Sequence, residues 1–151
     1  MEMEILRYRE YVPPSLDGFD ASYEERLKGA QCWAIAAYIY LIDICRMGQD
    51  YTEKIDCLVR EFLAVYDGMN WEGPTVTQMV WPILEVGLWC KEVDERRKVM
   101  NYMEKLYRTV NMGTIKTIME IMKQHWRDGV SLDDILAGRK WQGAGIDFLP
   151  C

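Results

Sequence analysis

Between Trp81 and Trp126 apolar residues return every three or four positions, the spacing that places them on one face of an α-helix. One helix is expected at 94–110 and the next begins after residues 111–113, and in both the charged side chains lie off the apolar face. Such faces are buried by packing against other helices, and the short turn predicts an antiparallel hairpin. The apolar positions are Val99, Met103, Leu106 and Val110, followed by Ile115, Ile118, Met119, Met122 and Trp126.

Two further helices are expected before residue 81. The first begins at a capping box formed by Ser22 and Glu25 and ends near Gly48. Because its second half is apolar on nearly all faces, it should be the central, most buried helix. The second helix opens at Asp50 and ends at Gly68. Its apolar face consists of Ile55, Leu58, Val59, Phe62, Leu63 and Tyr66.

A connector with two glycines and a proline, residues 67–75, separates two helical pairs within one domain. The helix that follows contains Pro82, which a helix tolerates in its first turn or as a kink. It also contains Gly87, which costs about 1 kcal/mol relative to alanine inside a helix. We therefore expect Gly87 to let another helix approach closely. Ser131 and Asp134 are expected to cap a final short helix.

These patterns predict an all-α fold, a single helical domain of about five to six helices packed as antiparallel hairpins. A chain of 151 residues is long enough to bury roughly two-thirds of its unfolded surface in one core. Pro13, Pro14 and Gly18 make residues 1–20 an extended lead-in, because proline disfavours helix at its own position and at the preceding one. Residues 21–151 then form the helical domain.

Composition argues against binding to nucleic acid and against insertion into a membrane. The net charge is -6 and the sequence pI is about 4.9, whereas affinity for nucleic acid depends on Lys and Arg that neutralise phosphates. The longest nearly apolar run, residues 32–45, is too short to span a bilayer and contains Asp43. The charged N-terminus lacks the apolar core of a signal peptide. We expect a soluble protein that is not secreted.

No pattern of catalytic or metal-binding residues is apparent. The single histidine, His125, has no Ser or Cys nucleophile in a partnering motif and is expected to be a partly exposed or hydrogen-bonded helical residue. Asp133 and Asp134 are adjacent and point apart. We therefore expect no catalytic residue, no metal ligand and no cofactor. The cysteines are odd in number, form no CxxC pair and are expected to be reduced, buried thiols: Cys32, Cys45, Cys57, Cys90 and Cys151.

Glu85 is the most unusual residue, because its neighbours in the helix are almost all apolar. Two interpretations stay open. Its carboxylate either lies on the one wet face of the helix or pairs with an arginine, or it is a polar anchor in a ligand pocket together with Trp81 and Trp89. The run of charges at residues 95–98 is expected to be a solvated helix face, and the many methionines after Val99 are expected to fill the core.

The order of motifs from Val80 to Trp126 resembles the C-terminal part of the fungal-specific transcription factor domain of zinc-cluster (Zn2Cys6) regulators. The chain reads VWPILEVG, then ERRKVMNYME, then NMGTIKTIMEIMKQHW. A Trp-Pro start, a helix glycine, a basic pair after a short acidic turn and a distal Trp recur in this order. The segment Ala30–Ile42 is similar to the Ala- and Tyr-rich helix of the family, so the likeness begins near Ala21. The motif positions are Trp81, Pro82, Gly87, Arg96, Arg97 and Trp126.

The resemblance implies an α-helical regulatory region, not an enzyme, which in full-length members lies C-terminal to the zinc cluster and modulates activation, sometimes in response to small metabolites. This chain contains no zinc cluster, so we expect no direct binding to nucleic acid by this segment. The family region is normally longer, which makes this chain the C-terminal portion of it. Two positions depart from the pattern, since Trp89 stands where an acidic residue is common and Glu85 near a position that is commonly apolar.

Three functions follow as hypotheses. The first is a regulatory or interaction domain of a fungal zinc-cluster transcription factor. The second is a free-standing interaction module derived from that family, such as a decoy, a scaffold or a host-directed factor. The third is a small-molecule carrier, favoured by the aromatic content and by Glu85. The expected partners are a protein, a second copy of the chain or a small-molecule effector, and neither nucleic acid nor a membrane.

Overall fold

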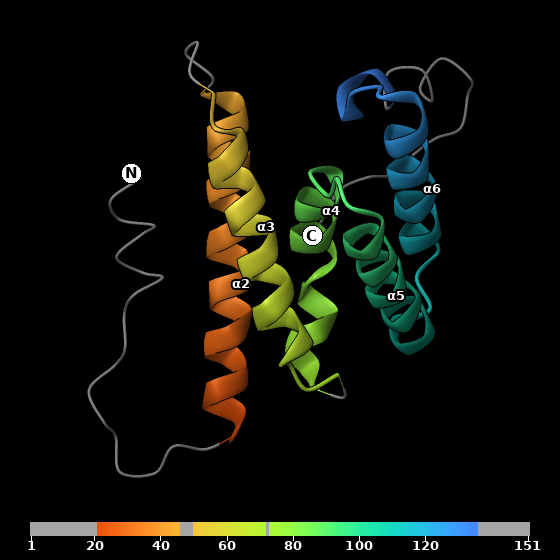
Figure 1. Ribbon diagram of the computed structural model, residues 1–151. Coiled ribbons are helices and arrows are strands. Elements are labelled where there is room, and N and C mark those ends of the chain that lie inside the picture. Colours follow the sequence, from red (N-terminus) through yellow and green to blue (C-terminus); the bar gives the residue numbers. More distant parts are fainter. Residues whose placement is uncertain (1–20, 46–49, 72, 136–151) are drawn as a thin grey trace.

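The computed structural model describes residues 21–45, 50–71 and 73–135. These residues form helices and connecting turns and no strand, as the all-α prediction requires (Figure 1). Residues 132–135 add one further helical turn. The elements are α2 (Ala21–Ile44), α3 (Thr52–Asp67), the 3-10 helix η1 (Pro74–Gln78), α4 (Val80–Leu88), α5 (Val93–Val110) and α6 (Gly113–Asp128).

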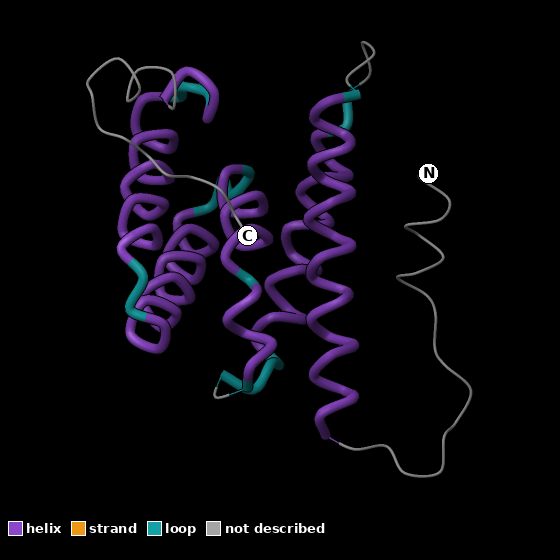
Figure 2. Tube along the Cα trace, turned by 180° about the vertical axis from the view of Figure 1, so that it is seen from behind, coloured by secondary structure: helices purple, strands orange, loops and turns teal. Residues whose placement is uncertain are grey.

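The helices form two antiparallel pairs with α4 between them. In Figure 1, α2 and α3 lie side by side at one edge and α5 and α6 at the other, and the reverse view in Figure 2 shows the same arrangement. Helix α4 contacts α2 on one side and both α5 and α6 on the other. The prediction of antiparallel hairpins is thereby confirmed, and α4 is the element that both pairs share.

Helix α3 follows its predicted pattern closely. All six residues assigned to its apolar face are buried, and the helix ends at Gly68 as expected. At its start the Asp50 carboxylate accepts a hydrogen bond of 2.9 Å from the backbone N–H of Thr52. A charged acceptor at this end also interacts favourably with the helix dipole.

Helix α2 differs from its prediction in two respects. It already includes Ser22, so the expected cap at that residue is wrong. The Glu25 carboxylate instead accepts a hydrogen bond of 2.8 Å from the backbone N–H of Asn70, beyond the end of α3. The predicted end at Gly48 lies outside the described residues.

The central, most buried helix is α4 and not α2. Helix α2 lies at the edge of the molecule, and the face it turns away from α3 and α4 is exposed. In α4 the six consecutive residues from Pro82 to Gly87 are all buried. Pro82 occupies the third position of the helix, where its missing N–H removes no intrahelical hydrogen bond.

The α5–α6 hairpin is set by its ends. Helix α5 begins at a capping box in which the backbone N–H of Glu92 donates to the Glu95 carboxylate at 3.3 Å. It ends at Asn111, whose φ of 52° turns the chain toward α6. After α6, Ser131 Oγ accepts a hydrogen bond from the backbone N–H of Asp134 at 3.2 Å, which confirms the predicted cap.

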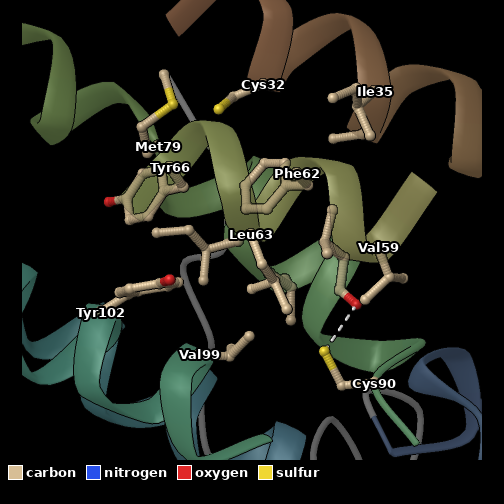
Figure 3. Close-up of a cluster of buried hydrophobic side chains, with 14 of the residues drawn as sticks. Cys32, Ile35, Val59, Phe62, Leu63, Tyr66, Met79, Cys90, Val99 and Tyr102 are labelled. Carbon is tan, nitrogen blue, oxygen red and sulfur yellow. Dashed lines mark hydrogen bonds between the residues drawn. The ribbon is translucent and has the colours of Figure 1, made fainter. Parts of the chain in front are cut away.

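An aromatic seam joins α3 to α5 within the core, and we define it as Tyr66, Trp71 and Tyr102. The ring of Tyr66 meets that of Tyr102 edge-on, with 4.6 Å between centroids, and Figure 3 shows the two side chains facing each other across the core. Trp71 packs against both rings. The hydroxyl of Tyr102 donates to the Asp67 carboxylate, which also pairs with Lys98 at 2.8 Å. The two helix pairs are therefore in contact at α4 and again along this seam.

Candidate functional site

Aromatic side chains from α2 and α4 gather on one side of the molecule. Trp81 stacks on Trp33 with ring centroids 5.1 Å apart and an interplanar angle of 21°, and Tyr40 meets Trp81 edge-on at 6.1 Å. Trp33 and Tyr40 are seven residues apart, so two helical turns place them on the same face of α2, and Ile44 continues that face. The three side chains remain 40%, 46% and 61% exposed, in that order.

Glu85 lies one turn after Trp81 in α4 and is only 6% exposed. Burial and, to a smaller extent, the nearby charge of Asp43 on α2 raise the pKa of its carboxyl group to about 7. Within the described part of the chain no Lys or Arg forms an ion pair with Glu85. Of the two interpretations, the buried position therefore argues against a carboxylate on a wet face.

The Glu85 carboxylate nevertheless stays in contact with solvent. Among the described residues, the one enclosed side-chain oxygen or nitrogen that lacks a hydrogen bond is the hydroxyl of Tyr66. Glu85 makes no hydrogen bond within the described residues, so its oxygens must reach the molecular surface. The Glu85 carboxylate is therefore buried in most of its surface but not sealed from water.

Trp89, the third of the predicted ligand residues, is the C-cap of α4 and is partly buried against the core. Trp81 makes aromatic contacts with Trp33 and Tyr40 of α2. Trp33, Tyr40 and Asp43 complete this side of the molecule, although none of them is among the predicted ligand residues. The sequence did contain a signal for them. Helix α2 is apolar on nearly all faces, and its hairpin partner α3 can cover only part of that apolar surface.

A second cluster forms where α4 ends against α5 and α6. The backbone at Gly87 lies so close to both helices that an added Cβ would meet Met122 Sδ at 2.7 Å and Val99 Cγ1 at 3.0 Å. This confirms the expected close approach at Gly87. From α6, Trp126 Nε1–H donates to the carbonyl of Gly87 at 2.8 Å.

His125 of α6 is also hydrogen-bonded to the C-terminal end of α4. Its two ring nitrogens lie 2.9 Å from the carbonyl of Leu88 and 2.7 Å from the carbonyl of Val130. A neutral imidazole has one N–H and donates to one of these carbonyls, whereas the protonated ring donates to both. His125 is thus a hydrogen-bonded helical residue, as predicted, and with Trp126 it satisfies carbonyls that the last turn of a helix leaves without intrahelical partners.

The two arginines of the basic pair have different environments. Arg96 Nε–H donates to the carbonyl of Cys90 at 2.9 Å, and its guanidinium lies over the ring of Trp126 at 5.4 Å from the centroid. Arg97 is exposed and pairs with Asp94 of its own helix. The prediction of a solvated basic face is therefore wrong for Arg96 and right for Arg97. Three of the motif positions, Gly87, Arg96 and Trp126, meet in one junction.

The described residues contain little that suggests reaction chemistry. Burial raises the pKa of the thiols of Cys32 and Cys90 to about 12, which keeps both neutral. Cys45 and Cys57 are exposed, so the prediction of buried thiols is wrong for these two, and Cys151 lies outside the described residues. Across the described ranges no three His, Cys, Asp or Glu side chains are grouped closely enough to hold a metal ion.

No helix in the described part of the chain has both the length and the apolar character needed to cross a membrane.

Comparison with curated proteins and with solved structures gives no match. In a comparison with family models, residues 1–130 match the model described as the fungal specific transcription factor domain. The match contains the α2–α4 aromatic side chains and the whole junction at Gly87. The chain belongs to the family of fungal specific transcription factor domains.

Proposed function

We propose that this chain is the regulatory domain of a fungal zinc-cluster transcription factor and acts through protein or effector binding, with DNA contacts made by another part of the factor. Family membership supports a role in transcriptional regulation. The acidic net charge supports the absence of direct DNA binding by this segment. A nuclear or cytoplasmic location follows from that role.

The observation that carries the proposal is the position of two clusters on opposite sides of one short helix. Trp81 and Glu85 of α4 face α2, whereas Gly87 faces Val99 and Met122 of the α5–α6 hairpin. Two residues along an α-helix correspond to a rotation of about 200°, which puts Glu85 and Gly87 on nearly opposite faces. Because α4 is nine residues long and hydrogen-bonded at its end to α6, a displacement by a ligand on the α2 side is passed to the hairpin.

A transcription reporter tests this proposal. The full chain is fused to a bacterial DNA-binding domain in a fungal host, and output from a reporter with the matching operator is compared with that of the DNA-binding domain alone. We expect the fusion to change output, and we expect Trp33→Ala on the exposed side and Gly87→Ala at the junction each to alter it at least threefold. Val93→Ala, at an exposed position on α5, serves as the matched control. Output equal to that of the DNA-binding domain alone would contradict a regulatory role.

A second candidate function, a small-molecule carrier, is supported by the buried carboxyl group of Glu85 beside aromatic rings. A thermal-shift screen of metabolites and lipids tests it, since a ligand at a hundred times its dissociation constant adds about 2.7 kcal/mol to the free energy of unfolding. A true ligand should lose its effect in Glu85→Gln or Trp81→Phe. A flat screen would leave the carrier function without support.

A further inference from the structure

We define the α2–α4 surface as Trp33, Tyr40, Ile44, Trp81 and Glu85. Building on the proposed function, we propose that this surface binds a helix of a partner protein that is apolar on one face and carries a Lys or Arg side chain directed at Glu85. Three features of this surface favour a partner of this chemical class.

The first observation is the extent of the exposed apolar face on α2. Trp33, Tyr40 and Ile44 follow one another at spacings of seven and four residues, the pattern of one helix face. At 1.5 Å per residue this face extends for about 16 Å. It presents large side chains over two to three turns, which is the length over which an amphipathic helix places its i, i+4 and i+7 anchors.

The second observation is the charge of the surface. Glu85 lies beside the exposed face and, within the described residues, has neither a cation nor a hydrogen-bond donor as partner. Asp43 on α2 adds a second negative charge close to it. A guanidinium or ammonium group placed there gains from the Glu85 carboxylate, whereas an acidic partner would be repelled.

The third observation bears on two other occupants, a second copy and a small organic cation. Two copies meeting through this surface would bring Glu85 and Asp43 of each copy together, and each copy carries a net charge of -6. A small cation needs an open aromatic face, but the rings of Trp33 and Trp81 already cover one face of each other. A basic amphipathic helix satisfies both the apolar length and the charge.

Calorimetric titration with a model helix tests the proposal. The probe is an 18-residue amphipathic peptide with Leu on one face and Lys on the other, and a second peptide has Glu in place of Lys. We expect the Leu/Lys peptide to bind the full chain at least tenfold more tightly than the Leu/Glu peptide. Ile44→Ser should weaken its binding at least fivefold, and the matched control Val93→Ser, an exposed aliphatic residue on α5, less than twofold. Equal effects of the two serine variants would overturn the proposal.

Glu85 provides a readout that a purely apolar contact would not give. A bound Lys favours the ionised carboxylate, so affinity for the Leu/Lys peptide should rise at least threefold between pH 6 and pH 8, through the pKa of about 7. Asp43 is the described charged group that faces Glu85 from α2, and its side chain is exposed. Glu85→Gln should abolish the rise. The same rise in Glu85→Gln would contradict the assigned role.

Three further results would overturn the partner class. They are comparable binding of the Leu/Glu peptide, self-association in sedimentation that Trp33→Ala removes, and Trp33 indole resonances that tetramethylammonium shifts as strongly as the peptide does. The reporter separates this inference from the proposed function. If the peptide does not bind but Trp33→Ala still alters transcription, the regulatory role stands and only the partner class fails. If the peptide binds but the fusion leaves transcription unchanged, the partner class stands and the regulatory role fails.

Discussion

At Glu85 a carboxyl group is held where its charged form is poorly solvated. The side chain is 6% exposed, and the described charge that acts on its pKa is that of another carboxylate, Asp43. Both effects favour the protonated form, so the pKa in the folded state lies near 7 while an unfolded glutamate has a value of about 4.5. The folded state therefore holds a proton that the unfolded state releases between these two pH values.

This difference predicts that stability falls as pH rises. Between pH 4.5 and pH 7 the folded state binds more protons than the unfolded state, so the free energy of unfolding decreases across this window, by at most about 3 kcal/mol from this group. The contribution is complete below pH 4.5 and lost above pH 7. Urea unfolding of the wild type and of Glu85→Gln at pH 5, 6, 7 and 8 measures it. The variant should gain on the wild type as pH increases, and parallel curves would show that the carboxyl group titrates normally.

Some residues of the site were accessible to sequence reasoning and others were not. Glu85 and Gly87 were singled out because each contradicts its local pattern, an acid among apolar neighbours and a glycine inside a helix. Trp33 was not singled out, and Arg96 was recognised as a motif position but expected on a solvated face, because both contacts join residues far apart in the chain, Trp33 with Trp81 and Arg96 with Trp126. Periodicity identifies the face of a helix on which a residue lies but not the helix that will meet that face.

At the scale of elements, one close approach sets the distance between α2 and η1. A Cβ added at Gly29 would lie 2.4 Å from Thr75 Cγ2. Overpacking of this kind costs about 1–3 kcal/mol, against a gain of about 1 kcal/mol that alanine brings to a helix. We therefore predict that Gly29→Ala lowers the free energy of unfolding, by up to about 2 kcal/mol. Thr75→Ser removes the clashing methyl group, so in that background Gly29→Ala should be neutral or stabilising, as chemical denaturation can show. An equal loss in both backgrounds would point to a different cause.

The turn between α5 and α6 depends on a left-handed residue. Asn111 has a φ of 52°, a conformation that costs about 1 kcal/mol for residues with an ordinary Cβ and little for glycine. We predict that Asn111→Ala lowers the free energy of unfolding by about 1 kcal/mol and that Asn111→Gly changes it by only a few tenths. Thermal unfolding followed by circular dichroism compares the two. Equal stabilities of the Ala and Gly variants would show that the turn adopts another conformation in solution.

The helices themselves were predictable, because α3, α5 and α6 each have one apolar face and recognisable ends. The position of α2 was not. Its apolar residues are spread around the helix, and this pattern predicts the central, most buried helix. In the folded chain α4 takes the central position, and one face of α2 stays exposed because no described helix covers it. The pattern reports how much of α2 is apolar, whereas the number of neighbours is decided by the whole assembly.

At the scale of the whole molecule, the two hairpins share one core. Helix α4 packs against both, and the ring of Tyr66 on α3 meets that of Tyr102 on α5. Two ion pairs also connect the hairpins, because Asp56 and Asp67 of α3 bind Lys91, which precedes α5, and Lys98 of α5. Neither hairpin can separate without exposing α4, whose residues from Pro82 to Gly87 are buried between them.

This arrangement predicts that the chain unfolds in a single cooperative transition and that each hairpin depends on the other. Native-state hydrogen exchange measures the opening free energy of each helix separately. Gly29→Ala perturbs the α2 side and Asn111→Ala perturbs the α5–α6 turn. Each variant taken by itself should nevertheless lower the protection of the slowest amides in α3 as much as that of the slowest amides in α6. Because the two sites lie on different elements without shared contacts, their effects should add in the double variant. If Gly29→Ala lowered protection in α2 and α3 alone, the hairpins would be separate folding units, and a displacement of α4 by a ligand would then reach α6 without the support of a continuous core.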